Sequence, residues 1–430
     1  MGNLKNFQLI MVVLFAFGGI LGVFVFAGFI DLGDKAVTST PTGTVTLWGT
    51  VPNNIVTPIL DPINNTATLK IRYVYKNPNT FDQDLLEAFA INQAPDLFFV
   101  SDDNIINNLN KIAVTPYTTY PLLNFKNNFA SAGEVFLNNQ GVLAFPILVD
   151  PLMMYYNRTL LDSNNIVYPP EYWDQFPDLV KTFTQKDNNS SFTQSAFALG
   201  QYNNINNAKN IIVSLFMQNG NEITYKYNNL YRSAIKKDIE IDPGLANSLY
   251  FYLSFADPLN KNYSWNRALP NSLDAFSKED LVFYFGFASE LKTLLNKNPN
   301  HNFAVAPLPQ NRNNNLKTTH AKVTGIAISS NSKNKSLAPL ALSNLVSGSF
   351  AEKLSYALGI PPARRDLLAK KGLDTYTPVF YSSALFARSF IDTKDSHIIF
   401  RNMIEEVLSN GFKVEDAINN LSNRFNLLLN

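Results

Sequence analysis

The sequence contains no cysteine in its 430 residues. A chain without thiols forms no disulfide, no Cys-ligated zinc site and no cysteine nucleophile, and it offers no cysteine for lipid attachment. Histidine is scarce as well, since only His301, His320 and His397 occur and they are scattered. The chain also lacks HExxH, GxSxG and Walker A motifs, so the common metalloprotease, serine hydrolase and P-loop patterns are absent.

An excess of charge of either sign is missing too. Lys and Arg number 35 against 34 Asp and Glu, which gives a net charge of +1. Nucleic-acid binders need a basic footprint, so this balance argues against nucleic acid as a partner. Hydrophobic residues make up 46% of the chain, enough for a substantial core. A chain of this length is expected to form two lobes rather than one domain of average size.

One long apolar run stands at the N-terminus. Residues Leu9–Ile30 carry no charge. At about 1.5 Å per residue the run spans about 33 Å, enough to cross a bilayer core of about 30 Å, whereas a cleavable signal peptide has a shorter apolar core. Lys5 precedes the run and Asp31 follows it, which favours an extracytoplasmic body. We therefore expect residues 1–30 to be a single-pass anchor in the lipid bilayer of the cell membrane, followed by a tether, residues 31–42.

The body begins with α/β patterns. Alternating β-branched and aromatic residues predict strands at 44–49 and 69–76, and apolar residues at helical spacing predict a helix over 80–92. The stretch "DLFFV" (96–100) is a continuous apolar run, typical of a strand buried on both faces. The expected order of strand, strand, helix, strand indicates an α/β fold with helical crossovers and mostly parallel sheets.

The rest of the body continues in the same way. Further apolar strands are expected at 141–149, 195–200, 281–285, 302–310 and 322–332, helices are expected over 169–185 and 207–220, and a helical pattern prevails beyond residue 336.

Acids in apolar surroundings are the first candidate binding residues. Asp150 interrupts the apolar run "FPILVDPLMMYYN", and Asp102 and Asp103 directly follow "DLFFV". Each of these acids also has an interpretation in which its role is structural and it binds no ligand. Asp150 precedes Pro151 and would suit a turn, while an acid at the start of a helix commonly acts as its N-cap.

Aromatic residues are the second set of candidates. Trp48 ends the first strand, and Phe287 follows Gly286 at the end of another. Tyr155 is adjacent to Tyr156, and neighbouring residues of a strand face opposite ways, so one of the two belongs to the core. Simple packing is the alternative for each of these aromatic side chains.

Five segments in order resemble a known family. They are "APDLFFVSDDNI", "FPILVDPLMMYYNRTLL" followed by "PPEYWDQF", "KEDLVFYFGFASEL", "NFAVAPLPQ" with "VTGIAISSNSKNKSLAPLALSNLVS", and "VLSNGFKVEDAINNLSNRFN". Together they extend over residues 43–425. This pattern resembles the carbohydrate-binding group of extracellular solute-binding proteins that serve bacterial ABC importers, the group that includes maltose-binding protein.

The resemblance implies a two-lobed periplasmic-binding-protein-like fold (type II) with a hinge. Residues 43–147 plus 304–348 would form one lobe, and residues 148–303 plus 349–430 the other. Asp103 and Asp150 match family positions that face the cleft. Carboxylates accept strong hydrogen bonds from sugar hydroxyls, and aromatic rings cover the apolar face of a sugar. The chain departs from the family after Gly286, where many members carry a tryptophan.

The implied function is capture of a carbohydrate or similar polar solute for ABC permease subunits, by a monomer without cofactor, metal or enzymatic activity. The expected ligand-binding residues are Trp48, Asp102, Asp103, Asp150, Tyr155 and Phe287. An anchored adhesion or scaffold protein that keeps the fold without transport is the alternative. A more remote one is a glycoside hydrolase that uses Asp103 and Asp150 as its carboxylate pair.

Overall fold

The computed structural model describes residues 42–66, 68–227, 230–235, 242–312, 316–372 and 374–429. The predicted anchor, residues 1–30, and all but the last residue of the predicted tether lie outside the described residues. Within the described ranges, no helix combines the length and the apolar character that a membrane span needs.

The body opens with alternating strands and helices. β1 (Gly43–Gly49), α2 (Asn53–Thr66), β2 (Leu69–Tyr75), α3 (Phe81–Ala90) and β3 (Leu97–Ser101) follow one another. The predicted order of strand, strand, helix, strand is therefore wrong, because it lacks α2. That helix contains Pro58 and Pro62, which disfavour a helix interior and hid it from the sequence pattern. Because α2 and α3 act as crossovers, β1 pairs in parallel with both β2 and β3.

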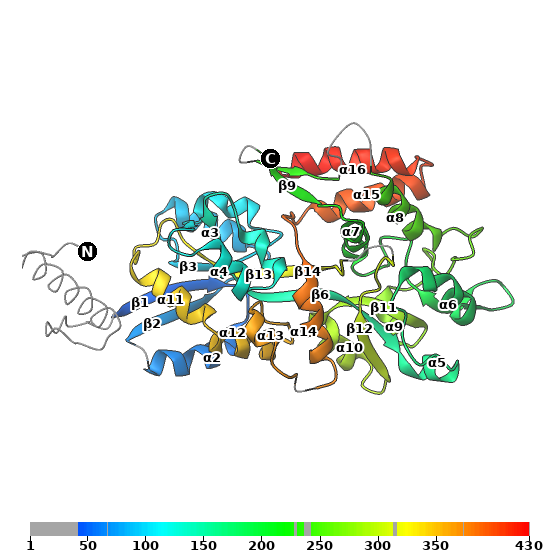
Figure 1. The fold of residues 1–430 in the computed structure, drawn as a ribbon, viewed down its shortest axis with the longest axis horizontal. Helices are drawn as coiled ribbons and strands as arrows, with labels where there is room; N and C mark the ends of the chain where they lie inside the picture. Colours follow the sequence, from blue (N-terminus) through cyan, green and yellow to red (C-terminus); the bar gives the residue numbers. More distant parts are fainter. Residues whose placement is uncertain are drawn as a thin grey trace, which may run out of the picture. The chain divides into compact units, whose positions relative to one another are not determined.

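The strand β6 (Phe145–Asn157) connects two groups of strands. Its first half pairs with β13 (Thr319–Ile328), and its second half pairs with β11 (Leu281–Phe287) and β12 (Phe303–Pro307). Figure 1 shows β6 running from the side of β1 and β3 to the side of β11 and β12. The strand continues through Asp150 and Pro151, so the turn interpretation of Asp150 is wrong. All its residues except Tyr156 are buried, which explains its apolar sequence.

The main sheet is mixed rather than mostly parallel. Its strand order is β2-β1-β3-β13-β6-β11-β8-β7. β13 runs antiparallel to both β3 and β6, and β6 runs antiparallel to β11 and β12, so the expectation of mostly parallel sheets is wrong. The remaining strands are β4 (Thr115–Pro116), β5 (Gly141–Val142), β7 (Gln185–Lys186), β8 (Phe192–Phe197), β9 (Thr224–Tyr227), β10 (Leu230–Ser233) and β14 (Ala387–Arg388).

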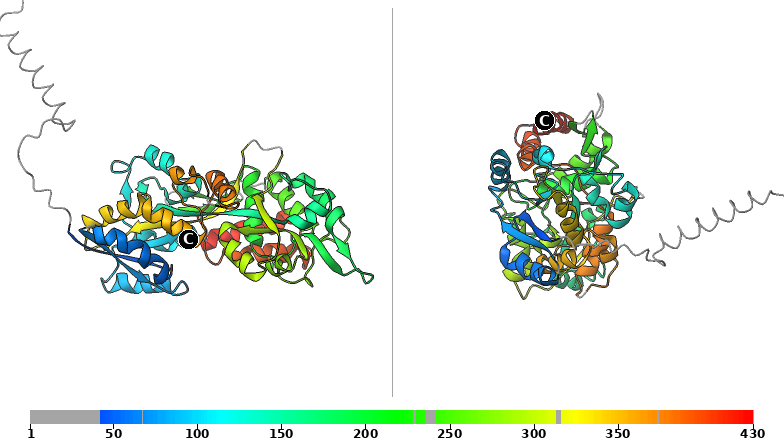
Figure 2. Two further views of the ribbon diagram at one scale, coloured as in Figure 1. Left: turned by 90° about the horizontal axis from the view of Figure 1, so that it is seen from below. Right: turned by 90° about the vertical axis from the view of Figure 1, so that its left-hand side faces the viewer.

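Helices surround this sheet and provide most of the C-terminal part (Figures 1 and 2). α7 (Ala208–Gln218) is buried at every position except Lys209, and it packs against β13 and α8. The other α-helices are α4 (Leu122–Asn128), α5 (Arg158–Ser163), α6 (Phe176–Phe183), α8 (Pro243–Ser254), α9 (Ser272–Ser277), α10 (Leu291–Lys297), α11 (Leu337–Val346), α12 (Ser349–Leu358), α13 (Arg365–Leu368), α14 (Thr377–Phe386), α15 (Ser396–Leu408) and α16 (Val414–Leu428).

Phenylalanine rings fill the core beside β8 and β11. Phe176 of α6 stacks on Phe197 of β8, with ring centroids 3.8 Å apart, and Phe197 stacks on Phe283 of β11 at 4.8 Å. Each ring buries a large apolar area, so this stack fixes α6 on the sheet. Residues 43–430 form one compact unit, and the predicted division into 43–147 plus 304–348 and 148–303 plus 349–430 stays a prediction.

Candidate functional site

Two acids lie where β3 ends, as the sequence predicted. Asp102 is buried, and its Oδ1 accepts a hydrogen bond of 2.7 Å from the backbone N–H of Val323 in β13. Asp103 is partly exposed, and its Oδ1 accepts from the Ser101 hydroxyl. The 3-10 helix that follows, Ile106–Lys111, has no side-chain cap. The capping interpretation therefore does not hold, and Asp102 instead joins β3 to β13.

Burial raises the pKa of Asp102 to about 8, and the negative charges of Asp103 and Asp392 act in the same direction. The hydrogen bond from Val323 opposes this shift. At neutral pH the side chain of Asp102 is therefore mostly protonated, which leaves Asp103 as the charged acceptor at the end of β3.

An ion pair faces these acids. Lys209, at the start of α7, lies 2.5 Å from Asp392 and donates a 3.0 Å hydrogen bond to the Ser396 hydroxyl. The exposed fractions of the two charged side chains are 15% and 4%, so the pair is largely withdrawn from water. The backbone N–H of Asp392 donates to the carbonyl of Asp102 at 2.9 Å. This contact brings a C-terminal segment against the end of β3.

These groups enclose a cavity of about 290 Å³. β13 contributes His320 and Lys322 to its wall. Burial, followed by the positive charges of Lys209 and Lys322, holds the pKa of His320 well below its usual value, so this ring is neutral. Asn210 lies 3.2 Å from its Nδ1. The lining residues are Asp102, Asp103, Tyr202, Ile205, Asn207, Ala208, Lys209, Asn210, His320, Lys322, Asp392 and His397.

Asp150 and Phe287 lie next to this cavity but are not among the described residues that line it. Asp150 is paired with Lys322 in the register of β6 and β13, and its Oδ1 accepts a 3.0 Å hydrogen bond from the N–H of Ser289. Burial raises its pKa to about 6, while the Ser289 bond and the charge of Lys322 lower it. The Lys322 ammonium lies 4.1 Å from the centre of the Phe287 ring. Lys322 thus connects both residues to the cavity.

Trp48 and Tyr155 lie elsewhere. Trp48 is partly buried at the end of β1, with the Lys76 ammonium 4.0 Å from its ring, and it is not among the described residues that line the cavity. Tyr155 has no exposed surface. Its hydroxyl donates to the carbonyl of Phe287 at 2.9 Å, and its ring packs against Phe303. These contacts argue against Tyr155 as a ligand-binding residue and identify it as the core member of the Tyr155–Tyr156 pair.

A model of the family described as bacterial extracellular solute-binding protein matches residues 65–345, more than half of the chain. The chain belongs to this family. A comparison with the sequences of curated proteins found no match.

Solved structures of sugar-binding proteins share the fold of this solute-binding protein. The cyclic alpha-maltosyl-1,6-maltose binding protein from Arthrobacter globiformis matches with a TM-score of 0.74 at 14% identity, over 90% of this chain and 99% of that chain. The sugar-binding protein MalE from Xanthomonas citri gives 0.72 at 16% identity, over 90% and 97%. The Staphylococcus aureus extracellular solute-binding protein in complex with maltose gives 0.70 at 16%, over 90% and 99%. At these identities the likeness shows the two-lobed α/β fold.

Several charged residues of the solute-binding protein's cavity were not predicted from the sequence, namely Lys209, Lys322 and Asp392. A signal was available for two of them. Lys209 lies two residues before the apolar stretch "IIVSLFM", and Asp392 ends "SFID", so each is a charge close to apolar residues, as Asp150 is. Among the described residues, no group of three or more His, Asp or Glu side chains is arranged to hold a metal ion.

Proposed function

We propose that this solute-binding protein captures a carbohydrate in the cavity at the end of β3 and delivers it to the permease subunits of an ABC importer. The observation that carries the proposal is the meeting of Asp102 and Asp103 with Lys209, Lys322 and Asp392 around one polar cavity. Family membership and the sugar ligands named for the similar structures support it. We further propose that residues 9–30 hold the protein in the cell membrane, with its body outside the cytoplasm.

Asp103 is the principal ligand acceptor in this proposal. Its Oδ1 is bonded to Ser101, and a carboxylate has further acceptor sites for sugar hydroxyls. Charge-assisted hydrogen bonds of this kind are strong. Tyr202 is the tyrosine among the described lining residues, and its hydroxyl donates to the carbonyl of His397 at 2.7 Å. This bond holds the ring at the cavity, where it would cover the apolar face of a sugar.

The size of the cavity limits the ligand. Ligand pockets commonly enclose about 300–1,000 Å³, and the cavity of about 290 Å³ falls at the lower end of this range. We therefore infer a monosaccharide or disaccharide rather than a long oligosaccharide.

Calorimetric titration of the full-length protein with a panel of mono- and disaccharides tests the proposal. Asp103→Ala should weaken binding of the best sugar by about tenfold or more, because it removes a charged acceptor worth about 1.5–3 kcal/mol. Its melting temperature should stay close to that of the wild type. Asp61→Ala removes an exposed carboxylate on α2 and serves as the matched control, with unchanged affinity.

Two results would contradict the proposal. If no sugar of the panel binds to the wild type, transport of a sugar loses its support and the adhesion or scaffold alternative gains. If Asp103→Ala lowers the melting temperature and leaves the affinity unchanged, Asp103 has a structural role only.

A further inference from the structure

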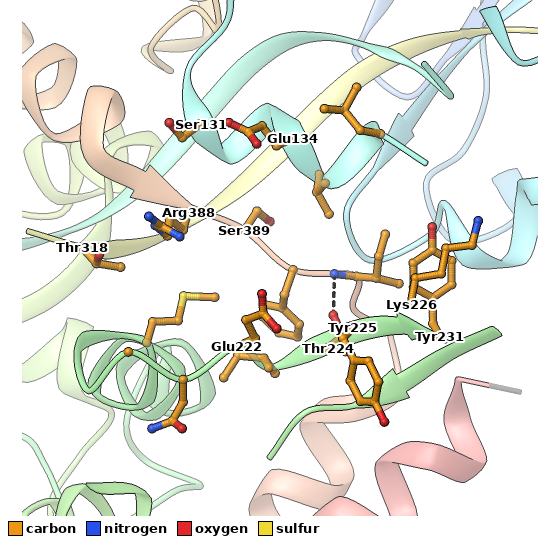
Figure 3. A pocket seen from close by; sticks show the side chains of 18 of the residues that line it. Ser131, Glu134, Glu222, Thr224, Tyr225, Lys226, Tyr231, Thr318, Arg388 and Ser389 are labelled. Atoms are coloured by element: carbon orange, nitrogen blue, oxygen red, sulfur yellow. Dashed lines mark hydrogen bonds between the residues drawn. The ribbon is translucent and has the colours of Figure 1, made fainter. Parts of the chain in front are cut away.

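A second, larger cavity lies at the opposite end of α7. Its volume is about 620 Å³. The start of α7 lines the candidate sugar cavity, whereas Met217, near the end of α7, and Gly220, just beyond it, line this one. The other walls come from β9, from residues 388–391 and from the 3-10 helix Ser131–Phe136 (Figure 3). No residue is shared between the two linings, so the cavities are separate sites.

The walls of the second cavity contain buried hydroxyl groups for which the described part of the chain provides no hydrogen-bond partner. The hydroxyls of Tyr231 and Ser389 are buried without a hydrogen-bond partner among the described residues. Thr224 accepts a 3.2 Å hydrogen bond from the N–H of Ile391, drawn dashed in Figure 3, and thereby joins β9 to the segment that carries Ser389. Buried polar groups are normally satisfied, so unpaired hydroxyls beside a cavity indicate a place where a polar ligand binds.

Two cations of this cavity also have no carboxylate partner in the part of the chain that the structure describes. Lys126 pairs with Glu134 at 3.1 Å, which neutralises both charges. Arg388 and Lys226, in contrast, form no ion pair among the described residues, and the Lys226 ammonium lies 5.9 Å from the centre of the Tyr231 ring. Figure 3 shows Arg388 and Lys226 at opposite ends of the pocket, with Glu134 and Glu222 between them.

We propose that this cavity is a second binding site, for a polyhydroxylated organic anion such as a sugar acid. The carboxylate of the ligand binds Arg388, whose planar guanidinium matches a carboxylate with two parallel hydrogen bonds. Lys226 adds positive charge at the other end. The hydroxyls of the ligand bond to Ser389 and to the acids in the middle of the pocket. The proposal is independent of the sugar site at the end of β3.

Titration of the full-length protein with galacturonate and with galactose tests this site. The two probes differ in the group at one carbon, a carboxylate in the first and a hydroxymethyl in the second. Galacturonate should bind in the second cavity more tightly than galactose does. Arg388→Gln and Lys226→Gln should each weaken galacturonate binding by about fivefold or more, since each removes a charge-assisted contact. Lys261→Gln, at an exposed lysine outside both cavities, should leave it unchanged.

The Asp103→Ala variant distinguishes binding at this site from binding at the sugar site. Because Asp103 does not line the second cavity, the variant should bind galacturonate as tightly as the wild type does. The proposal is overturned if galacturonate shows no binding up to about 10 mM. It is also overturned if neither Arg388→Gln nor Lys226→Gln weakens galacturonate binding. A third contrary result is that the Asp103→Ala variant, whose sugar site is impaired, binds galactose as tightly as galacturonate. Weakening by Asp103→Ala would place the anion in the sugar cavity and would overturn it as well.

Discussion

At the scale of single residues, the end of β3 shows how similar acids take different roles. Asp102 and Asp103 are adjacent, yet Asp102 is buried and bonded to β13, while Asp103 is partly exposed and bonded to Ser101. Asp392 is buried as well, but Lys209 compensates its charge. Burial without a cation raises a carboxyl pKa, and Asp102 therefore carries a proton at neutral pH.

This proton makes stability depend on pH. The pKa of Asp102 is about 8 in the folded protein against an ordinary value of 3.8, so the folded state holds a proton that the unfolded chain releases. The free energy of unfolding therefore falls as the pH rises from about 4 to about 8. Asp102→Asn keeps the acceptor for Val323 and removes this titration. As the pH rises from about 5 to about 8, the free energy of unfolding of the variant should increase by at least about 1 kcal/mol relative to that of the wild type.

Urea unfolding at both pH values measures this difference. Asp61→Asn, at an exposed acid, should show the pH dependence of the wild type. Equal pH dependence in Asp102→Asn and the wild type would mean that Asp102 is ionised in the folded protein.

At the scale of elements, β6 and β13 connect the two groups of strands, and their contact is close. β13 has an irregular register at Gly325, where a Cβ atom would lie 2.6 Å from the ring of Phe136 and 3.0 Å from the carbonyl oxygen of Phe145. Both aromatic side chains are buried, so neither can move away freely. A side chain at this position would push β13 away from β6.

Gly325→Ala should therefore lower the free energy of unfolding by about 1–3 kcal/mol. Thr324→Ala, at the neighbouring and partly exposed position, should cost less than about 1 kcal/mol. Denaturant midpoints of both variants give the comparison. An unchanged midpoint for Gly325→Ala would show that the strands have room for a methyl group.

Some helices and strands could be predicted from the sequence, and others could not. Alternation predicted β1 and β2, and helical spacing predicted α3, because local patterns of burial produce those signals. α2 was not predicted because Pro58 and Pro62 lie inside it, and its packing against β2 and α12 overrides their effect. The mixed parallel and antiparallel arrangement of the sheet was not predicted, because the direction of a strand relative to its neighbours depends on partners that are distant in sequence.

The residues of the candidate site also divide into those that the sequence could reveal and those that depend on distant partners. Asp103 could be placed at a cleft because the family resemblance implies an acid there, and Asp102 is its neighbour in the sequence. Lys209 and Asp392 could not, because their pairing joins residues far apart in sequence. Tyr155 could not be separated from Tyr156 by alternation alone, since only the register of β6 with β11 decides which ring faces the core.

At the scale of the whole molecule, we propose that a membrane anchor precedes the folded body. We predict that residues 9–30 remain on the mature protein, because the apolar run is long enough to cross a bilayer core of about 30 Å. Intact-mass measurement of protein extracted from membranes checks this. A mature chain that begins near Gly28 would contradict the prediction and would indicate a cleaved, secreted protein.

The central claim is that this solute-binding protein holds a sugar in the cavity at the end of β3. A crystal structure of the complex with the sugar that binds best tests it most directly. We predict that the sugar occupies the cavity between Asp103, Lys322 and Tyr202, with at least one hydroxyl within hydrogen-bond distance of the Asp103 carboxylate. A sugar bound in the cavity beside Arg388 instead, or one in the predicted cavity without contact to Asp103, would contradict the account.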